Sequence, residues 1–219
     1  MNVSPIRVAL IDDHRLVLDA LAYQIRTAGG MDVVCTSTTA EDGLRQMLDT
    51  RPDVVLLDVD LPGRGAFDLA SEVRSLIKSA KLLFLTGYSS DVLIDQALRL
   101  KASGYLMKFE PIQVLLDAIR AVAEGQVRFS REIEDRVTFD AVNKRYVLHA
   151  THPLSDLTFR QLEVLRHLAK GESVKEVARL MHLSQKSVDS HKYRIMHKLG
   201  IHDRVELARF AIREGLLLP

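Results

Sequence analysis

Five side chains in the first half of the chain are of the types that handle phosphoryl groups. They are Asp12, Asp13, Asp58, Thr86 and Lys108. Carboxylates held close together repel, and each raises the proton affinity of the others. A hard divalent cation relieves that repulsion, and Mg²⁺ accepts carboxylate oxygens while it keeps several waters. Since a hydroxyl and an ammonium bind phosphoryl oxygens, these residues predict a magnesium-dependent phosphoryl site if the fold brings them together.

The segments between these residues predict such a fold. Asp53–Asp58 is a short apolar run that ends in an acid, which is typical of a strand buried on both faces. Similar patterns predict strands at Ile6–Ile11, Met31–Cys35, Lys81–Thr86 and Gly104–Met107, and helices at Leu16–Ile25, Ala40–Leu48, Phe67–Ile77, Asp91–Leu100 and Pro111–Val122. Strict alternation predicts an α/β doubly wound parallel five-stranded sheet. The carboxyl ends of its strands share one edge, so the polar residues there can meet.

Each of these polar residues also has an ordinary explanation. Asp12 and Asp13 suit the N-cap of a helix, Thr86 is a common strand-end residue, and Lys108 is by itself a solvated charge. The shared site is favoured because all of them stand at matched strand ends.

The residues in this order, with Gly104-Tyr105-Leu106-Met107-Lys108, resemble the receiver domain of two-component response regulators over about residues 5–124. The resemblance implies that Asp58 accepts a phosphoryl group from a sensor histidine kinase and later loses it by autodephosphorylation, with no other enzymatic activity. It also implies that Asp13 and Asp58 bind Mg²⁺ directly, that Asp12 binds it through water, and that the backbone carbonyl of Asp60 is a further ligand.

The same resemblance assigns roles to three residues on the last two strands. Thr86 is expected to hydrogen-bond the phosphoryl oxygen, Lys108 to pair with it, and Tyr105 to be the aromatic that rotates inward on activation. Two positions depart from the family pattern. Ala66 replaces a usual glycine, and Phe109 replaces the proline that many receivers have after the lysine, so a cis peptide is not assumed there.

From Leu154 onward the sequence predicts four helices. Thr158–Gln161 and Ser173–Glu176 are capping boxes that open the first two helices, Ser184 caps the third, and Asp203 opens the fourth. The short connection His182-Leu183-Ser184 between the second and third helices predicts a helix-turn-helix. This part of the chain is therefore expected to be an all-α DNA-binding domain.

The third helix has a polar face opposite its apolar residues Val188, Ile195 and Leu199. Such a face can enter a major groove while lysine and arginine neutralise phosphates. Asp189 argues against this, because a carboxylate repels phosphates unless it accepts from a cytosine amine, and a solvated charged face is the plain alternative. The candidate DNA contacts are Lys186, Ser187, Ser190, Lys192, Tyr193, Arg194 and His197.

A wider pattern favours the DNA-binding interpretation. Leu157-Thr158-x-Arg160-x-x-Glu163-Val164-Leu165, Lys175-Glu176-Val177-Ala178, Ser187-Val188-x-x-His191 and Lys198-Leu199-Gly200 resemble the LuxR-type helix-turn-helix over about residues 154–217. Together the two halves resemble a NarL/FixJ-type response regulator. The resemblance implies a transcription factor that binds double-stranded DNA as a homodimer, with the last helix, Val205–Ile212, at the dimer contact. Core packing explains its Leu207, Ala208 and Ala211 equally well.

Composition and charge fit this division. Residues 1–124 carry 13 Lys/Arg and 17 Asp/Glu, a balance of −4, and residues 154–219 carry 12 and 8, a balance of +4. We expect a receiver at 1–124, a linker at 125–153 and a DNA-binding domain at 154–219. Within the linker, the pattern places Ile133 and Val137 on one face of a helix and predicts a short strand at Arg145–Leu148. The single cysteine, Cys35, and the lack of a long apolar segment predict a cytoplasmic protein with no membrane partner. One hypothesis is that the acidic receiver covers the basic domain until Asp58 is phosphorylated.

Two other interpretations remain open. Asp58-x-Asp60 resembles the acid pair of aspartyl-phosphate hydrolases of the haloacid dehalogenase group, although that group has the pair after its first strand. A hydrolase would leave the basic helix-turn-helix unexplained. The other alternative is a DNA-binding protein that is indifferent to phosphorylation, and it requires that changes at Asp58 leave DNA affinity unaltered.

Overall fold

The computed structural model describes residues 4–61, 65–87, 89–149, 154 and 157–217. The chain divides into two compact units. The first contains Met1–Gly87 and Ala97–Val147, and the second contains Tyr88–Gln96 and Leu148–Pro219. Within the described residues, no helix has the length and apolar character needed to cross a bilayer.

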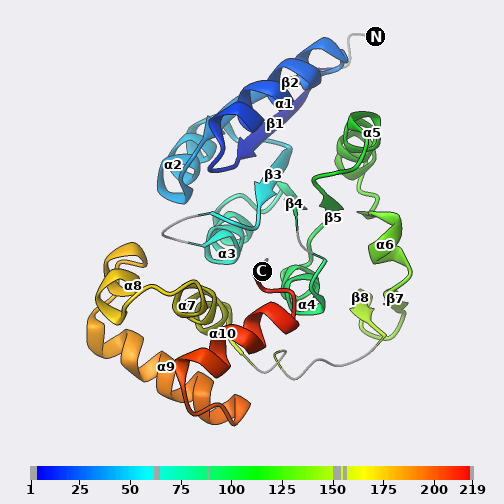
Figure 1. Ribbon diagram of the computed structural model, residues 1–219. Helices are drawn as coiled ribbons and strands as arrows, with labels where there is room; N and C mark the ends of the chain where they lie inside the picture. Colours follow the sequence, from blue (N-terminus) through cyan, green and yellow to red (C-terminus); the bar gives the residue numbers. More distant parts are fainter. Residues whose placement is uncertain (1–3, 62–64, 88, 150–153, 155–156, 218–219) are drawn as a thin grey trace. The chain divides into compact units, whose positions relative to one another are not determined.

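The first unit is built on a parallel sheet with the strand order β2-β1-β3-β4-β5-β6 (Figure 1). Its strands are β1 (Ile6–Ile11), β2 (Met31–Ser37), β3 (Val54–Asp58), β4 (Lys81–Thr86), β5 (Gly104–Met107) and β6 (Arg128–Phe129). In the central register Ile11 pairs with Leu57, Asp58 with Leu85, and Thr86 with Met107. The strands therefore end at nearly the same level, which brings their last residues to one edge.

The sheet has six strands in the described part of the chain, so the predicted number of five is wrong. The additional strand β6 runs parallel to β5, and Gly104 pairs with Arg128. A Cβ at Gly104 would lie 2.5 Å from the Arg128 carbonyl oxygen, so the backbones of β5 and β6 can come this close only with glycine at position 104. A strand of two residues carries no readable periodicity, which explains why the sequence did not predict it.

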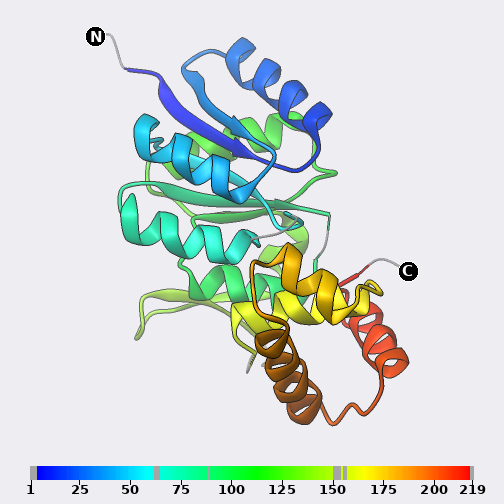
Figure 2. The ribbon, with the colours of Figure 1, turned by 90° about the vertical axis from the view of Figure 1, so that its left-hand side faces the viewer.

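Helices cover both faces of the sheet. One face packs against α1 (Arg15–Thr27) and α5 (Ile112–Ala123), whose buried Leu18, Ile25 and Ile119 join the strand residues in one core. The other face packs against α2 (Ala40–Thr50) and α3 (Ala66–Leu76); the Phe67 ring of α3 lies 5.3 Å from the Phe84 ring of β4. Figure 2 shows α2 and α3 in front of the strands and α5 behind them. The remaining helix of the alternating pattern is α4 (Asp91–Arg99).

The segment after α5 has structure of its own. It contains β6, the short helix α6 (Arg131–Glu134) and a two-stranded hairpin of β7 (Val137–Asp140) and β8 (Arg145–Leu148). The strand predicted at Arg145–Leu148 is confirmed, but the helical face proposed for Ile133 and Val137 is wrong, because Val137 begins β7. The Tyr146 ring lies 5.2 Å from the rings of both Phe129 and Phe139, so aromatic packing holds the hairpin.

Most of the second unit consists of four helices. They are α7 (Phe159–Ala169), α8 (Val174–Leu180), α9 (Gln185–Leu199) and α10 (Arg204–Arg213). Both predicted capping boxes are present, at Thr158 and Ser173. Gly200 ends α9 in the left-handed region with φ of 66°, where glycine costs nothing. Val188 and Ile195 are fully buried, so they fix the rotation of α9 about its axis.

Candidate functional site

Three of the predicted acids meet at the carboxyl edge of the sheet. Asp12 follows β1 and Asp58 ends β3, and both are almost fully buried, whereas Asp13 is partly exposed. One ligand atom from each of Asp12, Asp13, His14 and Asp58 can be chosen so that all four lie within 4.8 Å of one another. The topology therefore brings together residues that are 46 positions apart in the chain.

Lys108, directly after β5, joins the acids. Its Nζ lies 2.8 Å from Asp12 Oδ2 and 2.8 Å from Asp58 Oδ2. Burial acts to lower the pKa of Lys108, but the interactions with both carboxylates outweigh it and raise the pKa above the usual value. Lys108 is therefore a fixed positive charge at neutral pH.

The environment of Asp58 changes its protonation. Burial raises the pKa of Asp58 to about 6; Lys108 works against this shift, and the charges of Asp12 and Asp13 add to it. Its Oδ1 atom is buried and has no hydrogen-bond partner among the described residues. An unpartnered carboxylate oxygen beside two further acids fits a hard cation bound through oxygen, and Mg²⁺ is such a cation.

His14 is part of this cluster, although it was not a predicted site residue. Its Nδ1 lies 2.7 Å from Asp13 Oδ1 and 3.3 Å from Asp12 Oδ1, and its backbone N–H donates to Asp12 Oδ1 over 2.8 Å. His14 is also the N-cap residue of α1. The backbone contact orients Asp12, so the start of the helix helps to shape the site. Its position next to Asp13 was the only sequence signal for this role.

Thr86 and Tyr105 form a buried pair on adjacent strands. Both are fully buried, their side chains are hydrogen-bonded, and the Tyr105 ring lies 6.2 Å from that of Phe84. Burial raises the pKa of Tyr105 above its ordinary value, against the opposing effects of Thr86 and Arg136. The structure thus has Tyr105 in the inward position. Arg136, which lies 31 residues along the chain, was not identified from the sequence.

Asp60 follows β3 and is partly buried. Its backbone carbonyl as a metal ligand remains a prediction.

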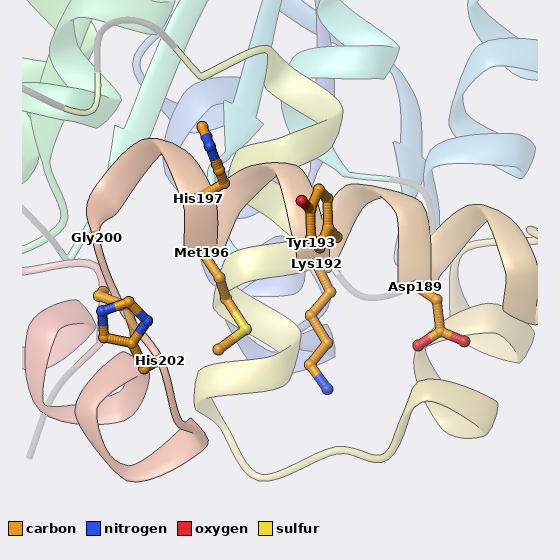
Figure 3. Close-up of a pocket in the computed structure, with 8 residues that line it drawn as sticks. Asp189, Lys192, Tyr193, Met196, His197, Gly200 and His202 are labelled. Carbon is orange, nitrogen blue, oxygen red and sulfur yellow. The ribbon is translucent and has the colours of Figure 1, made fainter.

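The α9 face is exposed as predicted. Lys186, Ser190, Tyr193, Arg194 and His197 are exposed, and Ser187 and Lys192 are partly exposed. A hollow of about 510 Å³ lies along this helix. It is lined by side chains drawn in Figure 3, those of Asp189, Lys192, Tyr193, Met196 and His197, and by the residues Gly200 to His202. The Tyr193 and His197 rings lie 6.2 Å apart, one turn from each other. This surface combines positive charge, hydrogen-bonding groups and an aromatic ring.

Comparison with known proteins identifies both halves of the chain. The family model "Response regulator receiver domain" matches residues 8–120, and "Bacterial regulatory proteins, luxR family" matches residues 155–211. The chain belongs to the NarL/FixJ family of response regulators. Members of this family are phosphorylation-controlled regulators of transcription, and this chain is one of them.

Relatives align with the chain over nearly its whole length. The "Uncharacterized transcriptional regulatory protein YxjL" of Bacillus subtilis is 31% identical over 99% of this chain and 100% of its own. "Response regulator UvrY" of Escherichia coli K12 is 31% identical over 96% of this chain and 95% of its own. RcsB of Salmonella enterica, solved bound to the rprA promoter, has a TM-score of 0.69 at 22% identity and covers 94% of this chain and 98% of its own. The RcsB likeness supports the fold.

Proposed function

We propose that Asp58 accepts a phosphoryl group from a sensor histidine kinase and that this event controls DNA binding by α9. The observation that carries the proposal is the convergence of Asp12, Asp13, Asp58 and Lys108, with Asp58 Oδ1 buried and unpartnered among the described residues. An acid in this state is ready to act as a nucleophile once its charge is balanced.

The transfer needs little covalent chemistry from the protein. An Asp58 carboxylate oxygen attacks phosphorus in line, the new O–P bond forms, and the N–P bond of the donor phosphohistidine breaks, with the electron pair leaving on the imidazole nitrogen. Mg²⁺ would be held directly by Asp13, Asp58 and the Asp60 carbonyl, and through water by Asp12. When bound, it would supply positive charge to the transferred oxygens. Lys108 already lies 2.8 Å from Asp58 and would pair with one such oxygen.

Thr86 and Tyr105 connect the phosphoryl group to the rest of the receiver. The Thr86 hydroxyl would hydrogen-bond a phosphoryl oxygen, and the inward Tyr105 bonded to Thr86 would hold that arrangement. Moving a two-state equilibrium from 1:99 to 99:1 takes about 5.5 kcal/mol. Two or three charge-assisted hydrogen bonds at about 1.5–3 kcal/mol each supply that amount. A phosphoryl group is therefore a sufficient switch.

The kinase contact is proposed to use apolar side chains that flank the acid cluster in the chain. Leu16, three residues after Asp13, is 82% exposed, and Phe109, next to Lys108, is 70% exposed. Leu16→Arg should slow transfer from the phosphorylated kinase and leave labelling by the small donor acetyl phosphate unchanged. The matched control is Leu76→Arg, because Leu76 is exposed on α3.

The DNA contact is proposed to be the α9 face. Lys186, Lys192 and Arg194 would neutralise phosphates, while Ser187, Ser190, Tyr193 and His197 would lie toward the base edges. The family's dimeric binding to paired half-sites is proposed for this chain as well, and exposed Val205 and Ile212, two turns apart on α10, are available for the contact. We keep the domain limits 1–124, 125–153 and 154–219 as part of the proposal, with the strand β6 of the linker segment joining the receiver sheet. Because the proposed partner is DNA, we also propose that the protein is located in the cytoplasm.

The experiment that tests the phosphoryl site is chemical labelling of the full chain. With acetyl phosphate and Mg²⁺, intact-mass measurement should detect one phosphoryl group per chain, which disappears in Asp58→Ala and when EDTA removes the metal. The control is Asp49→Ala, since Asp49 is an exposed acid on α2. Equal labelling of wild type and Asp58→Ala would refute Asp58 as the acceptor.

A further inference from the structure

Asp189 is the only acid in α9, and the structure exposes it on the face that the proposed function turns toward DNA. The helix carries four lysine or arginine residues, Lys186, Lys192, Arg194 and Lys198. Asp189 lines the hollow of Figure 3 together with Lys192 and Tyr193, and among the described residues its carboxylate has no ion pair or hydrogen bond. No hydrogen bond or ion pair inside the described part of the domain accounts for this acid.

The orientation of Asp189 is fixed by its neighbours. Val188, the residue before Asp189, and Ile195, seven positions after Val188, are both fully buried and fix the rotation of the helix about its axis. The start of the helix is held by Ser184, whose side chain accepts from the backbone N–H of Ser187 over 3.0 Å. Asp189 therefore faces away from the core whenever the domain is folded.

A carboxylate in this position discriminates among DNA groups by its chemistry. It only accepts hydrogen bonds, so it repels phosphates and the acceptor atoms of guanine and thymine. The donors in the major groove are the amino groups of cytosine and adenine, and adenine also presents the N7 acceptor beside its amine. We propose that Asp189 is a specificity-determining residue that accepts a hydrogen bond from a cytosine N4 amine in each half-site. This inference rests on the proposed function of α9.

The helix geometry relates Asp189 to Tyr193. Four residues along a helix advance it by about 6 Å, which corresponds to roughly two base steps of about 3.4 Å. Asp189 and Tyr193 would thus contact positions about two base pairs apart. The cytosine selected by Asp189 should occur at a fixed distance from the position that depends on Tyr193.

The test begins with the full-length wild type, treated with acetyl phosphate and Mg²⁺, and a library of random DNA duplexes. Repeated selection and sequencing yield the preferred site. Dissociation constants are then measured for that site and for every single base-pair replacement, with wild type, Asp189→Ala, Asp189→Asn and the matched exposed control Asp49→Asn.

We expect one C·G pair per half-site whose replacement weakens wild-type binding about 10-fold. In Asp189→Ala that preference should disappear, while the preferences at other positions remain. Asp189→Asn should prefer adenine there, because an amide pairs with both N6 and N7 of adenine. Asp49→Asn should match wild type.

A different result would overturn the inference. If both Asp189 variants bind every duplex more tightly by one common factor, with the base preferences unchanged, Asp189 only repels phosphates. A wild type that selects a sequence while no preference depends on Asp189 refutes this inference alone. A wild type that binds no duplex at all refutes the proposed function together with it.

Discussion

The acid cluster at the sheet edge and the exposed face of α9 are built in opposite ways. The cluster collects groups from the ends of β1, β3 and β5, and burial raises the pKa of Asp58 to about 6. The α9 face comes from one helix, is open to solvent, and includes Lys186, Tyr193 and His197 at helical spacing. Buried charges interact strongly because little water screens them, whereas exposed charges act weakly and additively.

That difference predicts that single changes in the cluster have large effects on phosphorylation and that single changes on α9 have graded effects on DNA binding.

The largest effect is expected for Lys108→Ala. The change removes the cation 2.8 Å from both Asp12 and Asp58 and leaves the two acids facing each other. Loss of one fixed electrostatic group at a reacting centre typically costs about 10²–10³ in rate, so the rate of labelling by acetyl phosphate should fall about 100-fold or more. Lys78→Ala, at an exposed lysine, is the control. Labelling of Lys108→Ala at the wild-type rate would show that Lys108 does not contribute to phosphorylation of Asp58.

The next effect concerns stability and pH. Because the folded-state pKa of Asp58, about 6, lies above its ordinary value of 3.8, the folded protein holds the proton more tightly than the unfolded chain. Ionised Asp58 therefore destabilises the fold above about pH 6, and the penalty vanishes below about pH 4. In EDTA, Asp58→Asn should raise the free energy of unfolding by about 2–3 kcal/mol at pH 7.5 and leave it unchanged near pH 3.5.

Urea denaturation at both pH values measures this difference, with Asp49→Asn as the control. Equal stabilisation at the two pH values would mean that the ionisation of buried Asp58 is not the cause. Addition of Mg²⁺ should reduce the advantage of Asp58→Asn, because the wild type then gains a metal that the variant holds less well.

A smaller effect is expected on α9. Arg194→Ala and Lys186→Ala should each weaken DNA binding by roughly 10-fold at low salt, equally for all sequences, and lower the slope of log affinity against log salt by about 1. Phosphorylation by acetyl phosphate should be unchanged. Arg131→Ala, at an exposed arginine of α6, is the control. An unchanged salt slope in the α9 variants would exclude them as phosphate contacts.

The smallest effect is expected for Tyr105→Phe, which removes only the hydroxyl bonded to Thr86. The packing against Phe84 remains, so the free energy of unfolding should fall by about 1 kcal/mol. The ratio of DNA affinities with and without acetyl phosphate should shrink by a few-fold. A ratio equal to that of the wild type would show that the Thr86–Tyr105 bond does not carry the signal.

The contrast between the acid cluster and the α9 face also explains which features the sequence could predict. The ends of β1, β3, β4 and β5 were readable from apolar runs followed by polar residues, and parallel topology alone was enough to bring Asp12, Asp58 and Lys108 to one edge. The α9 face followed from helical periodicity. The sequence did not predict the contribution of His14, because that depends on the side-chain geometry at the start of α1.

Two further features required the structure. The strand β6 is two residues long, and the charge of Arg136 near Tyr105 depends on a fold of residues 125–149 that has no periodic signature. The hairpin β7–β8 is held by rings that are distant in sequence, Phe129, Phe139 and Tyr146. Features that depend on a few specific tertiary contacts leave little trace in local sequence patterns.

The central claim is that occupancy of the acid cluster governs DNA binding by α9. The most direct measurement is the dissociation constant of the full chain for its selected duplex, by fluorescence anisotropy, with and without acetyl phosphate and Mg²⁺, for wild type and Asp58→Asn. The account predicts that wild type binds about 10-fold or more tightly after phosphorylation and that Asp58→Asn does not respond. An equal response of both proteins, or none in a wild type shown to be fully labelled, would contradict it.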